Sequence, residues 1–239
     1  MKTRRIFFRT GHPINGDEAR AWAAVAMDGV QPGLVAHVMN YRPGSTQTRT
    51  DFPLVQFFGG AEGFGLLGFA DDGMAAVDDV TLLLHKALSR QGGIVQIETA
   101  TLSNSIETRP YAMRYRVPRM VVQKKSIHLD WLSDPVKGKA HIERLFLDSL
   151  RRQAEAMGLT IPDSATVEFM GAKGTLAAKP KQDLKLGLLT LKQAEFDLNL
   201  RLGGIWTVGY QLGKGYGHFN ATHQLSGAST QEVTHALSQ

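Results

Sequence analysis

The stretch that decides the fold lies near the end of the chain, where residues 209–217 read Gly-Tyr-Gln-Leu-Gly-Lys-Gly-Tyr-Gly and residues 218–223 read His-Phe-Asn-Ala-Thr-His. Four glycines, one lysine and two tyrosines stand in nine residues. A loop with so few side chains permits left-handed backbone and exposes main-chain N–H groups. Three interpretations follow: a site for a nucleotide phosphate, a contact with a nucleic-acid backbone, or a tight turn between packed elements.

The phosphate-binding motifs of nucleotide enzymes do not fit this loop. A P-loop requires four residues between its glycines and a hydroxyl after the lysine. Here three residues separate Gly209 from Gly213, and Gly215 follows Lys214. The dinucleotide pattern G-x-G-x-x-G precedes a helix, whereas residues 213–217 run into a predicted strand. These departures disfavour a mononucleotide site.

The composition is that of a globular protein with a basic surface. The chain has 239 residues, 43% hydrophobic and 21% charged, with 27 Lys+Arg against 22 Asp+Glu. The absence of cysteine excludes disulfides, thiolate metal sites and a cysteine nucleophile. No apolar run reaches the ~18 residues of a membrane span, and the start is too short in apolar residues for a signal peptide, so we expect a cytoplasmic protein.

The positive charge is concentrated in the second half. Residues 109–152 hold eleven Lys/Arg and four Asp/Glu, and residues 173–192 hold five Lys and one Asp. Clustered basic residues are typical either of a nucleic-acid surface or of a solvated face.

The first half predicts the element order β-α-β-β-α-β, which is the ferredoxin-like pattern. Residue periodicity gives four strands and two helices. The strands are expected at residues 4–10, 33–40, 64–70 and 94–101, and the helices at 17–27 and 78–90.

The second half predicts a similar order after a linker at residues 102–110. We expect strands at 111–125, 166–171 and 218–222, a strand-rich segment at 184–200, a short helix or turn at 203–212 and a long basic helix at 137–157. The predicted fold class is therefore α+β, with two tandem ferredoxin-like domains at residues 1–102 and 109–239.

This arrangement resembles the RAMP superfamily of CRISPR-associated proteins. Its repeat-processing endoribonucleases carry a glycine-hydrophobic-glycine segment, then several residues, then glycine-aromatic-glycine before the last strand. Val208-Gly209 and Gly215-Tyr216-Gly217 are similar to that signature. The basic helix resembles the helical finger inserted in the type IV member.

The resemblance implies a specific activity. Such enzymes bind the stem-loop of a CRISPR repeat in precursor crRNA and cut once at the 3′ base of the stem, without metal or other cofactor. The ribose 2′-OH attacks the adjacent phosphate, leaving a 2′,3′-cyclic phosphate and a 5′-OH. The type IV member keeps the processed crRNA and joins other effector subunits. No membrane contact is implied.

Four residues are candidates for the chemistry, which needs proton carriers and cations around the developing charge. Many family members use a histidine on or near the first helix. Here His12 precedes that helix and His37 lies on a predicted strand, so the general base stays open between them. We predict Arg20 and Arg42 as phosphate clamps, since arginine is a poor base.

The candidate RNA-binding residues are basic or aromatic. Those on the basic helix are expected to follow the phosphates of an A-form stem, and Tyr111 and Tyr115, beside the strand arginines, to stack on bases. They are Arg114, Arg116, Arg119, Lys137, Lys139, Arg144, Arg151, Arg152, Lys173, Lys181, Tyr210, Lys214 and Tyr216, with Tyr111, Tyr115, Lys179 and Lys185 beside them. Lys214 is expected to face a phosphate, with RNA backbone lying against the bare loop.

Metal catalysis has little support in the sequence, because the histidines are scattered and the acidic pairs at 71–72 and 78–79 suit loop and helix-cap positions. Two alternatives remain open. One is a RAMP subunit that binds RNA in an effector complex without cutting it, and the other is an enzyme that uses the loop for a small phosphorylated ligand.

Overall fold

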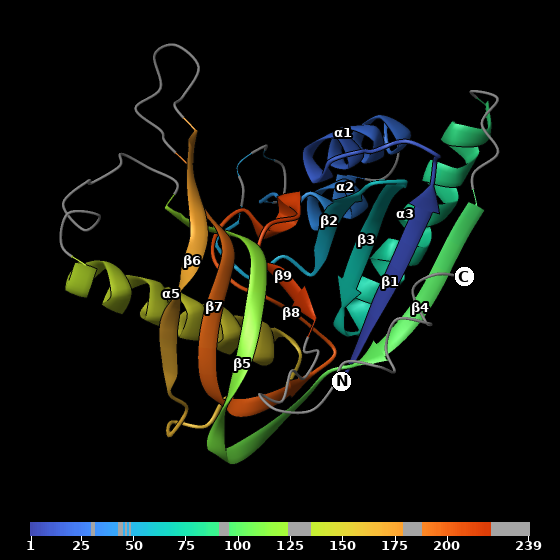
Figure 1. Ribbon diagram of the computed structural model, residues 1–239. Helices are drawn as coiled ribbons and strands as arrows, with labels where there is room; N and C mark the ends of the chain where they lie inside the picture. The colour runs from blue at the N-terminus through green and yellow to red at the C-terminus, as the bar shows by residue number, and fades with distance from the viewer. Residues whose placement is uncertain are drawn as a thin grey trace, which may run out of the picture.

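The computed structural model describes residues 1–29, 32–42, 45, 47, 49–90, 96–123, 135–178 and 188–220. Its helices and strands are shown in Figure 1. In chain order they are β1 (Lys2–Arg9), α1 (Gly16–Ala26), α2 (Pro32–Val38), β2 (Val55–Gly60), β3 (Gly63–Phe69), α3 (Ala70–Arg90), β4 (Gln96–Ser103), β5 (Ser105–Gln123), α5 (Pro135–Ala156), β6 (Val167–Ala178), β7 (Leu188–Gly203), β8 (Ile205–Thr207), the 3₁₀ turn η1 (Leu212–Lys214) and β9 (His218–Asn220).

The first half is an antiparallel sheet with the strand order β2-β3-β1-β4. Helices α1 and α3 pack on one face of it, because alternate residues of β1 and the apolar stripes of the helices are buried together. Ile6 and Phe8 from β1 meet Ala19 of α1 and Leu84 of α3 in this core. The element order is β-α-β-β-α-β with the extra helix α2.

Neither α2 nor β2 is predicted by the sequence. Residues 33–40 were expected as a strand but form α2, in which Val38 is buried and Leu34 and Val35 are partly buried. A short apolar run does not distinguish helix from strand, and Pro32 suits a helix start. Strand β2 was not predicted, because Gly59 and Gly60 weaken its strand pattern.

Helix α3 begins at Ala70 instead of residue 78, and its first turn holds Asp71 and Asp72. Acidic side chains stabilise the positive end of a helix, so these residues belong to the helix that they were expected to precede.

The second half is a three-stranded antiparallel sheet with the order β5-β7-β6, and α5 lies across one face of it (Figure 1). Ile142, Leu145 and Leu150 are buried in this core, and the Phe146 ring lies 4.2 Å from that of Phe196 on β7. The prediction that this helix is an inserted finger is therefore wrong: its apolar stripe is used to cover the sheet.

The predicted linker at residues 102–110 is strand. β4 ends at Ser103, β5 begins at Ser105, and only Asn104 lies between them. Asn104 is buried; its Oδ1 accepts from the Thr3 hydroxyl at 2.6 Å and its Nδ2 donates to the Ile205 carbonyl at 2.6 Å. This residue therefore joins the first sheet to the β8–β9 hairpin.

Candidate functional site

The glycines of the loop at 209–217 mostly face protein main chain. A Cβ at Gly217 would lie 1.9 Å from the Val208 carbonyl oxygen, and one at Gly209 would lie 2.6 Å from that of Val121. A Cβ at Gly215 would lie 2.7 Å from the Phe57 carbonyl oxygen. The expectation that these glycines make room for RNA backbone is corrected: at these three positions they let the loop pack on β2, β5 and its own start.

Gly213 differs, because its nearest neighbour within 4 Å is a side chain. A Cβ there would lie 3.9 Å from Nη1 of Arg20, and no backbone stands as close. Of the four loop glycines, this one leaves space for a ligand, and an arginine borders that space.

Helix α1 holds Arg20 against the end of α2. Its Nη2 donates to the Met39 carbonyl at 2.6 Å, and its guanidinium carbon lies 5.5 Å from the centre of the Tyr41 ring. The helix begins at an Asn15 cap, whose side chain accepts from the Glu18 N–H at 2.9 Å. These contacts orient the guanidinium beside the glycine loop.

Lys214 lies on the same side of the loop. Its Nζ is 3.3 Å from Oδ1 of Asp17, one turn before Arg20 on α1. The main chain of Lys214 also packs against the start of α1, since a Cβ at Gly16 would lie 2.4 Å from the Lys214 carbonyl oxygen. Two cations, Arg20 and Lys214, therefore border Gly213 where α1 meets the loop.

The other three catalytic candidates do not join Arg20 through a hydrogen bond among the described residues. Arg42 follows Tyr41 and is exposed. His12 is exposed in the turn before α1, with Nδ1 3.0 Å from the Thr10 carbonyl. That bond uses the Nδ1 proton and leaves Nε2 as a proton acceptor open to solvent.

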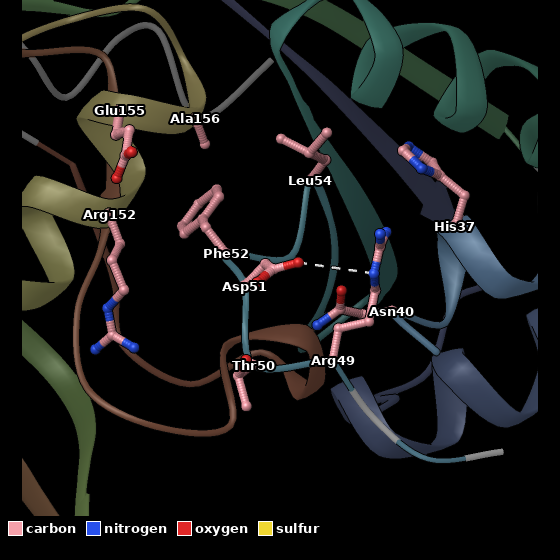
Figure 2. Close-up of a pocket in the computed structure, with 10 residues that line it drawn as sticks. All are labelled: His37, Asn40, Arg49, Thr50, Asp51, Phe52, Leu54, Arg152, Glu155 and Ala156. Carbon is pink, nitrogen blue, oxygen red and sulfur yellow. Dashed lines mark ion pairs between the residues drawn. The ribbon is translucent and has the colours of Figure 1, made fainter. Parts of the chain in front are cut away.

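His37 lies in the last turn of α2 and lines a separate cavity of about 460 Å³. Figure 2 shows His37 on one side and Arg152 and Glu155 of α5 on the other, with the Arg49–Asp51 ion pair of 3.7 Å between them. The Nε2 atom of His37 is buried and has no hydrogen-bond partner among the described residues. None of the residues that line this cavity belongs to the glycine loop.

One protein family has a sequence pattern that matches residues 2–224, and its description is "Type IV CRISPR-associated endonuclease Csf5". The chain belongs to this family. The resemblance inferred from the glycine motif is therefore confirmed, and the family is one of CRISPR crRNA endoribonucleases.

Solved structures show that this Csf5-family chain shares its α+β fold with Cas6 proteins. A structure of Csf5, a type IV Cas6 crRNA endonuclease, has a TM-score of 0.67 at 17% identity, covering 93% of this chain and all of that one. A Cas6b crystal structure gives 0.60 at 12% identity, with 92% and 99% covered. A second Cas6b structure, described as a CRISPR RNA processing endoribonuclease, gives 0.58 at 12% identity with the same coverage. No curated protein matches the chain significantly.

Several predicted RNA-binding residues of this Csf5-family chain are paired with carboxylates. Arg114 pairs with Asp197, to which its Nη2 donates at 2.8 Å, and Arg116 pairs with Glu195 at 2.7 Å. Lys139 pairs with Glu168 at 2.8 Å. The acidic partners come from β7 and β6, so the face of β5 that the sequence shows as basic is largely neutralised.

The aromatic candidates divide between buried and exposed positions. Tyr115 is 2% exposed, and its hydroxyl donates to the Leu200 carbonyl and accepts from the Leu202 N–H, both at 2.9 Å. The expectation that Tyr115 stacks on bases is therefore wrong. Tyr111 is exposed, Tyr210 is partly buried, and Tyr216 is partly buried with the Arg119 guanidinium 4.7 Å above its ring.

Helix α5 divides its cations between two sides. Lys137, Arg144 and Arg151 recur every seven residues and are exposed, whereas Arg152 lines the cavity with His37. Arg151 pairs with Asp148 at 3.6 Å, and Arg144 has no carboxylate partner within the described part of the chain. Lys173 on β6 is exposed, while Lys179, Lys181 and Lys185 lie outside the described residues.

Two groups that sequence reasoning missed hold the glycine loop to the first sheet. His218, directly after the loop, has Nε2 2.8 Å from Oε1 of Gln56 on β2. Gln56 is buried and its Nε2 donates to the Thr207 hydroxyl at 3.4 Å. Thr207 also donates to Gln153 of α5 at 3.0 Å. No local pattern predicts this chain of bonds, because its members are separated by up to 162 residues.

We expect the stability of the protein to fall as the pH decreases from about 6.5 to about 4. Burial lowers the pKa of His218 from 6.5 to about 4. In that window the unfolded chain binds a proton that the folded protein does not, so unfolding is favoured by as much as about 3 kcal/mol. Urea unfolding at pH 7 and pH 4.5 measures the loss. The His218→Gln variant has no group at this position that titrates in the range, so its free energy of unfolding should fall by about 3 kcal/mol less than that of the wild type. Equal losses in both proteins would contradict the role given to His218.

Among the described residues no three His, Asp or Glu side chains gather closely enough to hold a metal ion. Within the same residues, every helix is too short or too polar to cross a bilayer.

Proposed function

We propose that this chain cleaves the repeat stem-loop of precursor crRNA by attack of a ribose 2′-OH on the adjacent phosphate. The observation that carries the proposal is the position of Arg20, whose guanidinium lies between the Tyr41 ring and the open glycine of the loop. A fixed guanidinium at the junction of two elements is suited to the charge that develops on a phosphate in the transition state.

The reaction forms a bond from the 2′ oxygen to phosphorus and breaks the bond from phosphorus to the 5′ oxygen. The products are a 2′,3′-cyclic phosphate and a 5′-OH. We assign Arg20 to the equatorial oxygens, with Lys214 as a second cation when a phosphate replaces Asp17 as its partner. Arg42, exposed after Tyr41, is proposed as a further clamp.

Of the two histidines, we assign His12 as the carrier of the 2′ proton. Its Nδ1 is bonded to the Thr10 carbonyl and its Nε2 faces solvent, as a general base requires. His37 lines the cavity with Arg152, and its buried Nε2 is less suited to take up a proton from substrate than the exposed His12 ring.

We propose that the RNA stem lies along α5. The exposed stripe of Lys137, Arg144 and Arg151 has a spacing of about 10.5 Å per seven residues at the helix rise of 1.5 Å. A row of cations at that spacing can follow the phosphates of an A-form stem, whose deep major groove admits few side chains. The resemblance further implies that the processed crRNA stays bound and that other effector subunits assemble on it.

We also propose that both halves are ferredoxin-like domains. The first has the strand order β2-β3-β1-β4 that this fold requires. In the second, β5-β7-β6 corresponds to three of the four strands, and β9 adjoins β5 through the Gly217 N–H, which donates to the Arg119 carbonyl at 2.7 Å. The turn η1 stands where the second crossover helix would be.

The test uses two labelled stem-loop RNAs in EDTA, one all-ribose and one with a single 2′-deoxy sugar before the expected scissile phosphate. Cleavage of the first alone, with a cyclic phosphate on the 5′ fragment, is the expected result. Tight binding with both RNAs intact would favour the non-cleaving subunit. If neither RNA binds, the result would favour the alternative of an enzyme that uses the loop for a small phosphorylated ligand.

The uncleavable RNA also tests the stem contact in the same experiment. Replacing Lys137, Arg144 and Arg151 together with glutamine should weaken binding and reduce its salt dependence. The variant would neutralise fewer phosphates, so its binding would release fewer counterions from the RNA. Arg114→Gln with Arg116→Gln is the control on β5, and its effect should be smaller because hydrogen bonds to Asp197 and Glu195 hold both guanidiniums on the sheet. An unchanged salt dependence in the α5 variant would remove the helix from the interface.

A further inference from the structure

The first sheet has a second face, turned away from α1 and α3, that no catalytic role uses. Alternation along β1 buries Ile6 and Phe8 beneath the helices and places Arg5 and Phe7 on this opposite face. The strand register aligns Phe7 of β1 with Gly65 of β3, and Gly65 with Phe58 of β2. Two aromatic side chains therefore flank a glycine in one row across three strands.

Arg5, Phe7, Phe58 and Gly65 form what we call the arginine–aromatic tray. The two rings lie 6.0 Å apart and are inclined by only 22°, and the Arg5 guanidinium carbon lies 5.5 Å from the Phe58 centre and 5.9 Å from the Phe7 centre. A Cβ at Gly65 would lie 2.2 Å from the Phe58 ring, so the ring rests on bare strand. Both phenylalanines are only partly buried, although Phe58 also packs against the core of the second half, with the His218 ring edge-on at 6.1 Å. The tray is thus a flat, preformed π surface with a cation at its edge.

The charge of Arg5 is not neutralised within the described residues. The arginines beside it on β1 both have carboxylate partners: Arg4 pairs with Asp78 at 3.3 Å, and Arg9 pairs with Glu62 and Glu98. Arg5 contacts the aromatic rings instead. An arginine held by cation–π contacts keeps its N–H donors for an anion such as a phosphate.

The tray is continuous with the site of the proposed chemistry. Phe58 belongs to β2, and the main chain of Phe57 and Phe58 is where Gly215 of the glycine loop packs: a Cβ at Gly215 would lie 3.1 Å from Cα of Phe58. An RNA strand bound at Arg20 and Gly213 on one side of this contact can pass over β2 to the tray on the other.

We propose that the arginine–aromatic tray binds unpaired nucleotides that flank the repeat stem. Bases stack on the faces of Phe7 and Phe58, and Arg5 pairs with the phosphate between them. Partly exposed aromatic side chains on a sheet, combined with arginine, are suited to single-stranded RNA because every base offers a π face. This inference rests on the proposed function and adds a site for the substrate next to the stem.

The experiment compares two uncleavable 2′-deoxy stem-loops, one blunt and one with six unpaired adenosines on each side, by fluorescence anisotropy. The wild type should bind the extended RNA about tenfold more tightly, as stacking of one or two bases provides. Phe7→Leu, which keeps apolar packing but removes the ring, and Arg5→Gln should each reduce this gain below about threefold. Binding of the blunt RNA should not change. Lys86→Gln, an exposed cation on α3 behind the sheet, is the matched charge control and should keep the full gain.

A 2-aminopurine in the extension supplies a second measurement, since its fluorescence should be quenched by the wild type and recover with Phe7→Leu. Equal affinities of the wild type for the two RNAs, or an unchanged gain in both tray variants, would overturn the inference and leave the tray to a protein partner. If the stem-loop is cut but the extension adds nothing, this inference alone fails. If neither RNA binds, the proposed function fails with it.

Discussion

Gly217→Ala is expected to destabilise the protein by about 3 kcal/mol or more. The residue has φ of +76°, which strains any side chain, and a Cβ there would lie 1.9 Å from the Val208 carbonyl oxygen. The neighbours cannot move easily, because the Gly217 N–H donates to the Arg119 carbonyl on β5 and the Gly217 carbonyl accepts from the Val208 N–H, directly after β8. At about 2–4 °C per kcal/mol for a chain of this size, the melting temperature should fall by about 6–12 °C.

Gly213→Ala is the matched control, and urea and thermal unfolding followed by circular dichroism measure both variants. Gly213 is in the same loop, has no left-handed φ, and a Cβ there meets only the Arg20 side chain at 3.9 Å. Its stability should stay within about 1 kcal/mol of the wild type. Equal losses at the two positions would show that loop flexibility, and not the packing of Gly217, is what alanine removes.

Arg20→Ala is expected to reduce the single-turnover cleavage rate about 100-fold, which corresponds to about 2.7 kcal/mol of transition-state stabilisation. Affinity for the 2′-deoxy stem-loop should change less than about threefold, because a clamp on developing charge acts mainly in the transition state. Arg20→Lys keeps the charge but loses the planar fork that reaches the Met39 carbonyl, so an intermediate rate is expected.

Two control measurements test whether a slower rate comes from lost stability or from the loss of one positive charge. The melting temperature of Arg20→Ala shows whether loss of the Met39 contact has loosened α2, and Arg90→Ala, at the exposed end of α3, shows the effect of removing one positive charge elsewhere. A cleavage rate within about threefold of the wild type, roughly 0.7 kcal/mol, would show that Arg20 is not catalytic.

The two predictions separate roles that the sequence presents as one motif. Three of the loop glycines pack against main chain, while Gly213 and Lys214 remain beside Arg20 and Asp17. Glycine therefore allows the close packing of the loop at Gly217, and four residues earlier, at Gly213, it leaves space for a ligand beside Arg20.

The sequence by itself determined the first strand and first helix, the long amphipathic helix predicted at residues 137–157 and the glycine motif that identified the family. These features depend on local spacing: an apolar residue every three or four positions, or glycines at fixed intervals, is visible within one short window. Local spacing was insufficient for residues 33–40, since seven residues of mixed apolar character fit either a helix or a strand until α2 packs against the first core.

Only the tertiary structure decided which basic residues are available and which aromatic residues share a surface. Arg114 is paired with Asp197, 83 residues away, and Phe7 meets Phe58 across an intervening strand. Both contacts are set by strand register, which depends on how whole sheets bury their apolar faces. Arg5 and Arg114 both lie on strands, and they differ in what surrounds them: Arg5 contacts the rings of Phe7 on its own strand and Phe58 on β2, and Arg114 contacts two carboxylates of β7.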